Sequence, residues 1–363
     1  MASRRLTELF LELARLDAIP GKEAPVANHI SSFLKNLGLP AQMDGTAAAA
    51  LSNTSNVVCQ IGGGGDFALV AHMDTVRPTS ASEPAAAGGR LSTGGRGPLG
   101  ADGRAGLAAI LYALERAVHT YAQFKPFTLA FTTRGAGNLA GVKHLALPPG
   151  VRCGFTFAPG LPAGAYTASS HGVAVFSADI LGRAADAGTD PEGGVCAISI
   201  AARAIAALKF GRHDAETTSN VGTIAGGAGT SIVPPATLVR GQVRAAEAAR
   251  AQPLLEAFRA EFEKAAAAAG GAAAFKWAWE FQPYSHAPDS RVRQLAEAAL
   301  KGAGLTPAPS GAQQGGEAHA LNARGIASVA FGIGAGAVKT NDEYLSLEDL
   351  SSAAETVSSL IRT

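Results

Sequence analysis

The sequence predicts an α/β protein, in which a mixed sheet flanked by helices is interrupted by a smaller inserted α+β domain. Strand-like and helix-like segments alternate in the first half of the chain, which is typical of a sheet covered by helices. The pattern changes near residue 168 and returns to the first style from residue 288. We therefore expect a discontinuous larger domain, residues 1–167 and 284–363, around an inserted domain at residues 168–283.

The elements of the larger domain follow from hydrophobic spacing and from glycine-rich breaks. Apolar residues recur at helical spacing in residues 4–17 and 26–37. Two apolar runs, residues 56–61 and 67–72, flank four consecutive glycines, as expected for neighbouring strands joined by a turn. Further along, we expect a Gly/Pro/Ser-rich loop (78–100), helices (104–118, 138–146, 289–302 and from Leu347) and strands (126–133, 152–157 and 325–333).

The inserted segment shows the order strand, helix, strand, strand, helix, strand. This order is the split βαβ, or ferredoxin-like, arrangement, a compact two-layer unit. The expected elements are strands at 171–182, 219–227, 236–244 and 275–281, and helices at 191–211 and 246–268.

Composition restricts the class of protein and of partner. Because 47% of the 363 residues are hydrophobic, the chain can bury a large core. Its 30 basic and 29 acidic residues nearly cancel, so it has no excess of positive charge with which to bind nucleic acid or an anionic membrane. No run of 18 uncharged apolar residues occurs, and the first 16 residues resemble an amphipathic helix and not a signal peptide. Cys59, Cys153 and Cys196 form no CxxC pair, as expected in a reducing compartment. We expect a soluble cytoplasmic protein with no membrane or nucleic-acid partner.

Two short motifs place side chains suited to metal chemistry at the ends of predicted elements. His72 and Asp74 follow a buried strand, where a histidine can bind a metal and a nearby carboxylate can orient its ring. Asp102, in the segment GADGRAG, precedes a helix and can bridge two cations. Each motif also has a simpler interpretation, a packed histidine before a turn and a helix N-cap. Taken singly, neither motif establishes a site.

A longer series of motifs favours the functional interpretation. In chain order they are AHMDTV (71–76), GADGRAG (100–106), FTT (131–133), GTDPEGG (188–194), TTSNVGTIAGG (217–227), NARGI (322–326) and NDEYLSLEDL (341–350). In these motifs the sequence resembles the dizinc exopeptidase superfamily of peptidase T, carboxypeptidase G and aminoacylase, and most of all its peptidase T-like branch. The resemblance covers essentially the whole chain.

The resemblance implies a zinc-exopeptidase-like catalytic domain with an inserted lid and dimerisation domain. It also implies a homodimer that hydrolyses peptides or N-acyl-amino acids at two zinc ions. His72 matches the family's first histidine ligand, Asp74 its orienting carboxylate, and Asp102 the bridging aspartate.

The sequence departs from the family at the other positions of the site. Gly135 stands where the family has its general base, and Ala136 and Ala158 stand where it has carboxylate ligands. Lys339 takes the place of the last histidine ligand. Asp186 takes the place of a histidine in the inserted domain that is thought to polarise the scissile carbonyl.

The remaining ligands are too few for two zinc ions, because each zinc needs about three or four protein ligands. A charged Lys339 would also repel a cation, by about 4 kcal/mol per pair of unit charges at ~4 Å and an effective dielectric constant of ~20. We therefore expect Lys339 to pair with Asp102 or Asp74 and the protein to hold no zinc or substoichiometric zinc. Without a base at position 135, we expect the dizinc hydrolysis to be lost.

Other residues offer alternatives. Glu317 and His319 are candidate substitutes for the missing ligands, and Asn220 and Arg244 match positions that relatives use near the substrate, although Arg244 is equally a solvated charge on a strand. Three hypotheses stay open: a degenerate metallopeptidase whose cleft binds a small peptide or acyl-amino acid, an active hydrolase with a rebuilt one-metal or metal-free site, and a structural or interaction role with a vestigial cleft. Motifs of other enzyme classes, such as GxSxG, HExxH and Walker A, are absent from the sequence.

Overall fold

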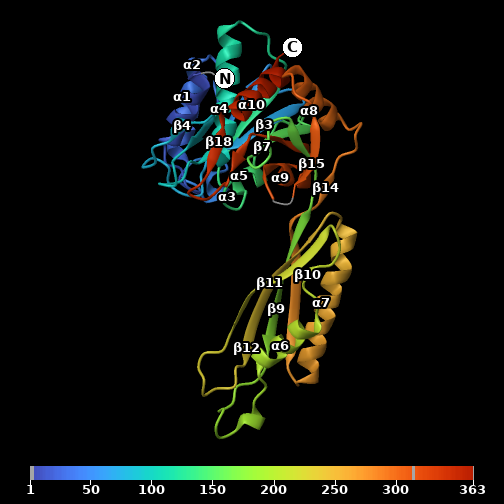
Figure 1. Ribbon diagram of the computed structural model, residues 1–363. Helices are drawn as coiled ribbons and strands as arrows, with labels where there is room; N and C mark the ends of the chain where they lie inside the picture. Colours follow the sequence, from blue (N-terminus) through green and yellow to red (C-terminus); the bar gives the residue numbers. More distant parts are fainter. Residues whose placement is uncertain (1–3, 313–314, 363) are drawn as a thin grey trace. The chain divides into compact units, whose positions relative to one another are not determined.

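A computed structural model describes residues 4–312 and 315–362 of the chain (Figure 1). The chain forms two compact units. The larger unit comprises Met1–Ser169, Ser285–Gly311 and Gly316–Thr363, and the inserted unit comprises Ser170–Tyr284 and Ala312–Gly315.

The larger unit is built on a mixed sheet of order β1-β2-β6-β3-β7-β16-β8-β14, with β15 paired to β8. The four strands β6, β3, β7 and β16 run parallel, so their carboxyl ends meet at one edge of the sheet. This confirms the expected mixed sheet. The strands are β1 Gln42–Met43, β2 Val57–Ile61, β3 Phe67–His72, β6 Phe127–Thr132, β7 Cys153–Ala158, β8 Ala165–Ser170, β14 Tyr284–Ser285, β15 Ala308–Ala312 and β16 Ala327–Gly332.

Helices cover this sheet. Because successive residues of a strand point to opposite faces, the odd-numbered and even-numbered residues of β3 contact different surroundings. Phe67 and Leu69 of β3 point into the main hydrophobic core, which also contains side chains of α1, α2, α4, α8 and α10. His72 and its register partner Thr132 of β6 lie at even positions and point to the opposite face, where α9 packs against β7 and β16. The helices are α1 Arg4–Ala14, α2 Ala24–Asn36, α3 Ala47–Ala50, α4 Ala101–His119, α5 Ala140–Lys143, α8 Arg291–Gly302, α9 Glu317–Ala323 and α10 Leu347–Ile361.

The inserted unit is an antiparallel sheet of order β10-β11-β12-β9-β13 with α6 and α7 on one face (Figure 1). Phe176, Phe258 and Phe275 form its aromatic core. The order of the four long strands is that of the expected ferredoxin-like unit. The elements are β9 Gly172–Leu181, α6 Ala197–Ala207, β10 Gly211–Arg212, β11 Thr217–Gly226, β12 Ala236–Ala245, α7 Ala248–Ala268 and β13 Ala272–Phe281.

Four local expectations were wrong. Strands β2 and β3, on either side of the four glycines, are not neighbours, because β6 lies between them in the sheet. The expected loop 78–100 contains a hairpin, β4 Ala85–Ala87 and β5 Arg90–Ser92, because β5 pairs with the distant β18, Tyr344–Ser346. The expected helix 138–146 is reduced to the four residues of α5, since the left-handed Leu139 (φ 59°) precedes it. The expected helix 191–211 is a 3₁₀ turn, Pro191–Gly193, followed by a break at residues 194–196 and then by α6, which ends at Ala207.

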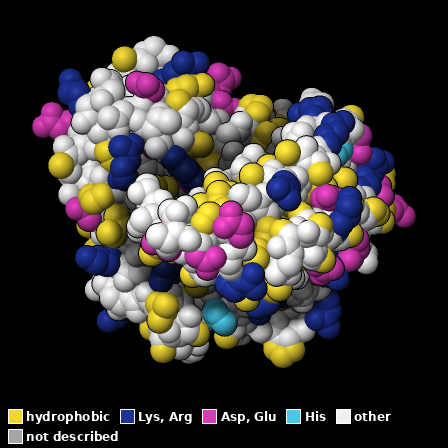
Figure 2. All heavy atoms as spheres, turned by 90° about the horizontal axis from the view of Figure 1, so that it is seen from below, with side chains coloured by type: hydrophobic (Ala, Val, Ile, Leu, Met, Phe, Trp, Pro, Cys, Tyr) yellow, Lys and Arg dark blue, Asp and Glu magenta, His cyan; other side chains and the backbone are white. Residues whose placement is uncertain are grey.

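No helix in residues 4–312 and 315–362 combines the length and apolar character needed to cross a bilayer. On the face drawn in Figure 2, basic and acidic side chains are interspersed, in keeping with their nearly equal numbers in the sequence.

A buried arginine links the start of α4 to the end of β3. The guanidinium of Arg104 is inaccessible to solvent and donates to the carbonyl oxygens of Met73 and of Leu16, the latter at 2.9 Å. Burial lowers the pKa of Arg104 to about 10, while the charges of Asp74, Asp17 and Glu23 oppose this shift. Arg104 therefore remains charged at neutral pH and fixes the segment that carries His72.

We predict that Arg104→Met lowers the free energy of unfolding by about 2–5 kcal/mol, because the two carbonyls lose their donor inside the protein. Denaturant unfolding measures the change. Arg96→Met, at an exposed arginine, is the matched control and is expected to change stability by less than about 0.5 kcal/mol. Equal stabilities of the two variants would contradict the assigned role of Arg104.

Candidate functional site

The candidate site lies at the carboxyl edge of the parallel strands. His72 ends β3 and Thr132 ends β6, and the two residues are register partners. Ala158 ends β7 beside Gly332, the last residue of β16. Asp102 reaches this edge from the first turn of α4. The fold therefore gathers side chains that lie far apart in the sequence.

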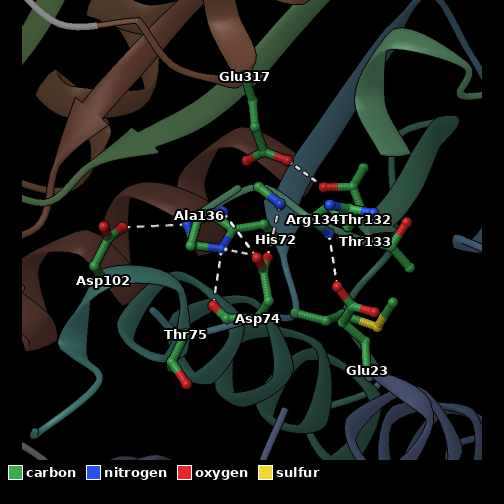
Figure 3. A network of polar contacts seen from close by, with 12 residues as sticks. Glu23, His72, Asp74, Thr75, Asp102, Thr132, Thr133, Arg134, Ala136 and Glu317 are labelled. Carbon is green, nitrogen blue, oxygen red and sulfur yellow. Dashed lines mark hydrogen bonds and ion pairs between the residues drawn. The ribbon is translucent and has the colours of Figure 1, made fainter. Parts of the chain in front are cut away.

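His72 is held between two carboxylates (Figure 3). Its Nδ1 lies 3.1 Å from Oδ1 of Asp74, and its Nε2 lies 3.2 Å from Oδ1 of Asp102. Burial lowers the pKa of His72, but the hydrogen bonds and charges of Asp102 and Asp74 outweigh burial and raise the pKa well above its ordinary value. Both ring nitrogens of His72 thus face a carboxylate, an arrangement that favours the protonated ring.

Asp74 also anchors the loop that follows β6. Its fully buried carboxylate accepts hydrogen bonds from the backbone N–H of Gly135 at 2.7 Å and of Ala136 at 2.9 Å. The preceding N–H, that of Arg134, donates to Oε1 of Glu23 at 2.8 Å. Two carboxylates therefore hold three successive amides of this loop against His72 (Figure 3).

Two glycines permit the close packing around His72. A Cβ at Gly135 would lie 2.2 Å from Cβ of His72, a distance that real Cβ atoms do not show. Gly103 has a φ of 93°, and a Cβ there would lie 2.8 Å from Cε1 of His72. The backbone at positions 103 and 135 therefore lies so close to the imidazole of His72 that neither residue has room for a side chain.

Lys339 brings an ammonium group to this site. Its Nζ lies 3.8 Å from Oδ2 of Asp102, so of the two expected partners the structure pairs it with Asp102. Lys339 has a φ of 68°, which is uncommon for a residue with a side chain. Burial raises the pKa of Asp102, but His72 and Lys339 outweigh burial and lower it. Asp102 therefore balances two cationic side chains.

Glu317 lies in the same pocket, whereas His319 does not line it. The pocket is lined by the ionisable side chains of His72, Asp102 and Glu317 together with apolar residues, among them Phe157. Thr132 donates a short hydrogen bond to Oε1 of Glu317 (Figure 3). Burial raises the pKa of Glu317, opposed by the charge of His72 and the Thr132 hydrogen bond. His319, two residues further along α9, is buried elsewhere.

The other residues singled out in the sequence belong to the inserted unit. Asn220 lies on β11 and Arg244 on β12. Asp186 is an exposed residue whose Oδ1 accepts the N–H of Gly188 at 2.9 Å and of Thr189 at 2.8 Å, so it stabilises a turn.

Sequence reasoning missed the carboxylates that support the loops of the site. Glu343 is buried and accepts the N–H of Gly100 at 2.8 Å and of Asp102 at 3.2 Å, which fixes the turn that carries Asp102. Burial raises the pKa of Glu343, and these backbone hydrogen bonds oppose the shift. The motif that begins NDEY at residue 341 could have pointed to Glu343 in the sequence. No motif in the sequence pointed to Glu23.

The side chains at this edge do not fit two zinc ions. Positions 135, 136 and 158 provide no donor side chain, and Lys339 brings a cationic group within 3.8 Å of Asp102. In the part of the chain that the structure describes, no three His, Cys, Asp or Glu side chains are grouped to hold a metal ion. His72 and Asp102 supply fewer than the three or four ligands that one zinc requires.

We predict that Gly135→Ala lowers the free energy of unfolding by about 1–3 kcal/mol, because the added methyl group overlaps His72. Thermal or denaturant unfolding measures this. Gly160→Ala is the matched control, since its Cβ meets no atom within 4 Å, and it is expected to change stability by less than about 1 kcal/mol. Full stability of Gly135→Ala would show that the loop does not pack on His72.

Comparison with known proteins gives the family. The model of peptidase family M20/M25/M40 matches residues 68–363. The structure is similar to aminopeptidase PepT from Bacillus cereus ATCC 10987, with a TM-score of 0.89 and 28% identity over 98% of this chain and 97% of that chain. It is equally similar to a tripeptidase from Staphylococcus aureus subsp. aureus Mu50, with a TM-score of 0.89 and 28% identity over 99% and 98% of the two chains. The protein YqjE of Bacillus subtilis (strain 168) is 28% identical over 362 residues, 99% of this chain and 98% of its own. Because the family model matches most of the chain, the protein belongs to peptidase family M20/M25/M40.

Proposed function

We propose that this protein keeps the fold and pocket of an M20 peptidase but has lost hydrolysis at two zinc ions. The observation that carries the proposal is the ammonium of Lys339 beside Asp102, at the position where the resemblance to peptidase T places a histidine ligand. The backbone at Gly135, which supplies no carboxylate, supports the same conclusion. In this proposal Lys339 and His72 balance the carboxylates that relatives would use for metal.

We propose further that the pocket binds a small peptide or an acyl-amino acid. The similarity to an aminopeptidase and a tripeptidase supports a peptide-like ligand. The pocket combines ionisable side chains with apolar walls from Phe157, Pro159 and Ile333, and its free volume of about 10 Å³ has room for only a small part of such a ligand. Three unpaired cysteines support a reducing, cytoplasmic location.

An active hydrolase with a rebuilt one-metal or metal-free site is the second candidate. The position of Glu317 in the pocket with His72 and Asp102 favours it, because a buried carboxyl is a suitable general acid or base.

We predict that protein purified without chelator contains well under one zinc per chain by elemental analysis. Trialanine incubated with the protein and added Zn²⁺ or Mn²⁺ is expected to stay intact, because no general base stands at position 135. Stoichiometric zinc with peptide turnover would refute the proposed loss. Turnover that Glu317→Gln abolishes would favour the rebuilt site.

We also propose that the chain forms a homodimer through its inserted unit. Ile198 of α6 and Ile224 of β11 expose large apolar side chains there, as Leu181 and Ile232 do. A second copy of the chain is the occupant that the family resemblance suggests.

Sedimentation at micromolar concentration is expected to give twice the chain mass of 36.5 kDa. The double variant Ile198→Glu, Ile224→Glu should shift the protein to monomer, whereas Tyr121→Glu, at an exposed residue of the larger unit, should not. A monomeric wild-type protein would contradict the proposed dimer.

A further inference from the structure

Among the described residues, the helices of the inserted unit cover only one face of its sheet. Helices α6 and α7 pack on that face, where Phe176 and Ala178 of β9 lie in the hydrophobic core (Figure 1). Because side chains alternate along a strand, Val175, Ser177 and Asp179 of β9 point to the other, open face. Val175 accordingly exposes 39% of its surface. Side chains of neighbouring strands therefore meet solvent together on the open face.

Two basic side chains flank Ser177 on this open face. Arg240 of β12 and Lys276 of β13 are both register partners of Ser177, so the three residues form one row across three neighbouring strands. Register partners have Cβ atoms about 5 Å apart, which lets the two long basic side chains converge over the serine hydroxyl. All three residues line a hollow of about 400 Å³. Arg244, further along β12, is not part of this row.

The positive charge of this row is largely uncompensated. Neither Arg240 nor Lys276 forms an ion pair with a carboxylate in residues 4–312 and 315–362. On these three strands the carboxylate closest in register is that of Asp179, about 7 Å further along β9 than Ser177. The row therefore presents two cations, opposed by one carboxylate at its side, to whatever occupies the hollow.

These groups match the terminal oxygens of a phosphate monoester. Such a phosphate carries close to two negative charges at neutral pH and has three acceptor oxygens. Arg240 and Lys276 supply two positive charges, and the hydroxyl of Ser177 supplies a third donor. A carboxylate has one charge and two oxygens, so it would leave part of the row without a partner.

The organic group of such a ligand has a neutral surface beside the row. Val175 and Ala278 line the hollow next to Ser177 and Lys276. Their own row, which Gln242 completes, carries no charge. An organic group on this side also keeps away from the carboxylate on the other side of Ser177.

We propose that the open face of the inserted sheet binds the phosphate of a small organic phosphate between Arg240 and Lys276, with Ser177 as a further donor and the organic group on Val175 and Ala278. The site lies entirely within the inserted unit. It therefore does not depend on the candidate site of the larger unit or on the proposed loss of hydrolysis.

Calorimetric titration of the full-length protein at low ionic strength tests this site. The probes are phenyl phosphate, inorganic phosphate and benzoate, which separate the contribution of the phosphate from that of the ring. Phenyl phosphate is expected to bind at least about threefold more tightly than benzoate, because it engages a second charge and a third oxygen. It should also bind more tightly than inorganic phosphate, which has no ring to contact Val175 and Ala278. Added salt should weaken binding, since the site is exposed.

Variants of both charge signs locate the binding. Arg240→Gln and Lys276→Gln should each weaken phenyl phosphate binding about two- to fivefold, the range of an exposed ion pair, and the double variant should abolish it. Asp179→Asn removes the opposing charge and should tighten binding about twofold. Arg203→Gln, at an exposed arginine of α6 on the helix-covered side, removes the same charge as Arg240→Gln and should bind as the wild type does. Melting curves check that each variant is folded.

Any of four other results overturns the inference. Absence of binding, or binding that the double variant retains, shows that the row does not hold the phosphate. Equal affinity for benzoate and phenyl phosphate overturns recognition of the phosphate group. Weaker binding by Asp179→Asn contradicts the assigned charge balance. All four leave the proposed loss of hydrolysis intact, because zinc content and peptide turnover test that proposal separately.

Discussion

The contact of His72 with two carboxylates determines the organisation of the candidate site. Asp74 and Asp102 approach opposite nitrogens of one imidazole, and each also binds something else. Asp74 holds the amides after β6, and Asp102 meets Lys339. Neutralising either carboxylate would leave the half-buried His72 ring short of a partner, so the loop, the start of α4 and Lys339 depend on one another.

The fold explains why these groups meet although their chemistry departs from that of a zinc centre. Parallel strands β6, β3, β7 and β16 end at one edge. Arg104 holds the residue that follows β3, and Glu343 holds the start of α4. All of these contacts are formed between groups of the chain itself. A chain can therefore retain the architecture of the M20/M25/M40 family while substituting side chains at the edge itself.

Much of the fold was predictable, because its long elements carry their own periodicity. His72 and Asp102 were also recognisable, but from the series of motifs that contains them, because a strand end and a helix start alone left a simpler interpretation open. The hairpin at β4 and β5 was not, since its pairing with β18 joins residues some 250 positions apart in the chain. The packing of Gly135 on His72 was not predictable either. The sequence shows that position 135 has no carboxylate, but it does not show that the backbone there lies against His72. Glu317 could be singled out in the sequence, but only its hydrogen bond to Thr132, the register partner of His72, shows that it lies on the same side of the sheet as His72.

Diffraction at the zinc absorption edge, from crystals grown with an excess of Zn²⁺, tests the central claim most directly. We predict no anomalous peak between His72 and Asp102 and continuous density for the Lys339 side chain beside Asp102. Two strong peaks bridged by the carboxylate of Asp102, with Lys339 displaced, would contradict it.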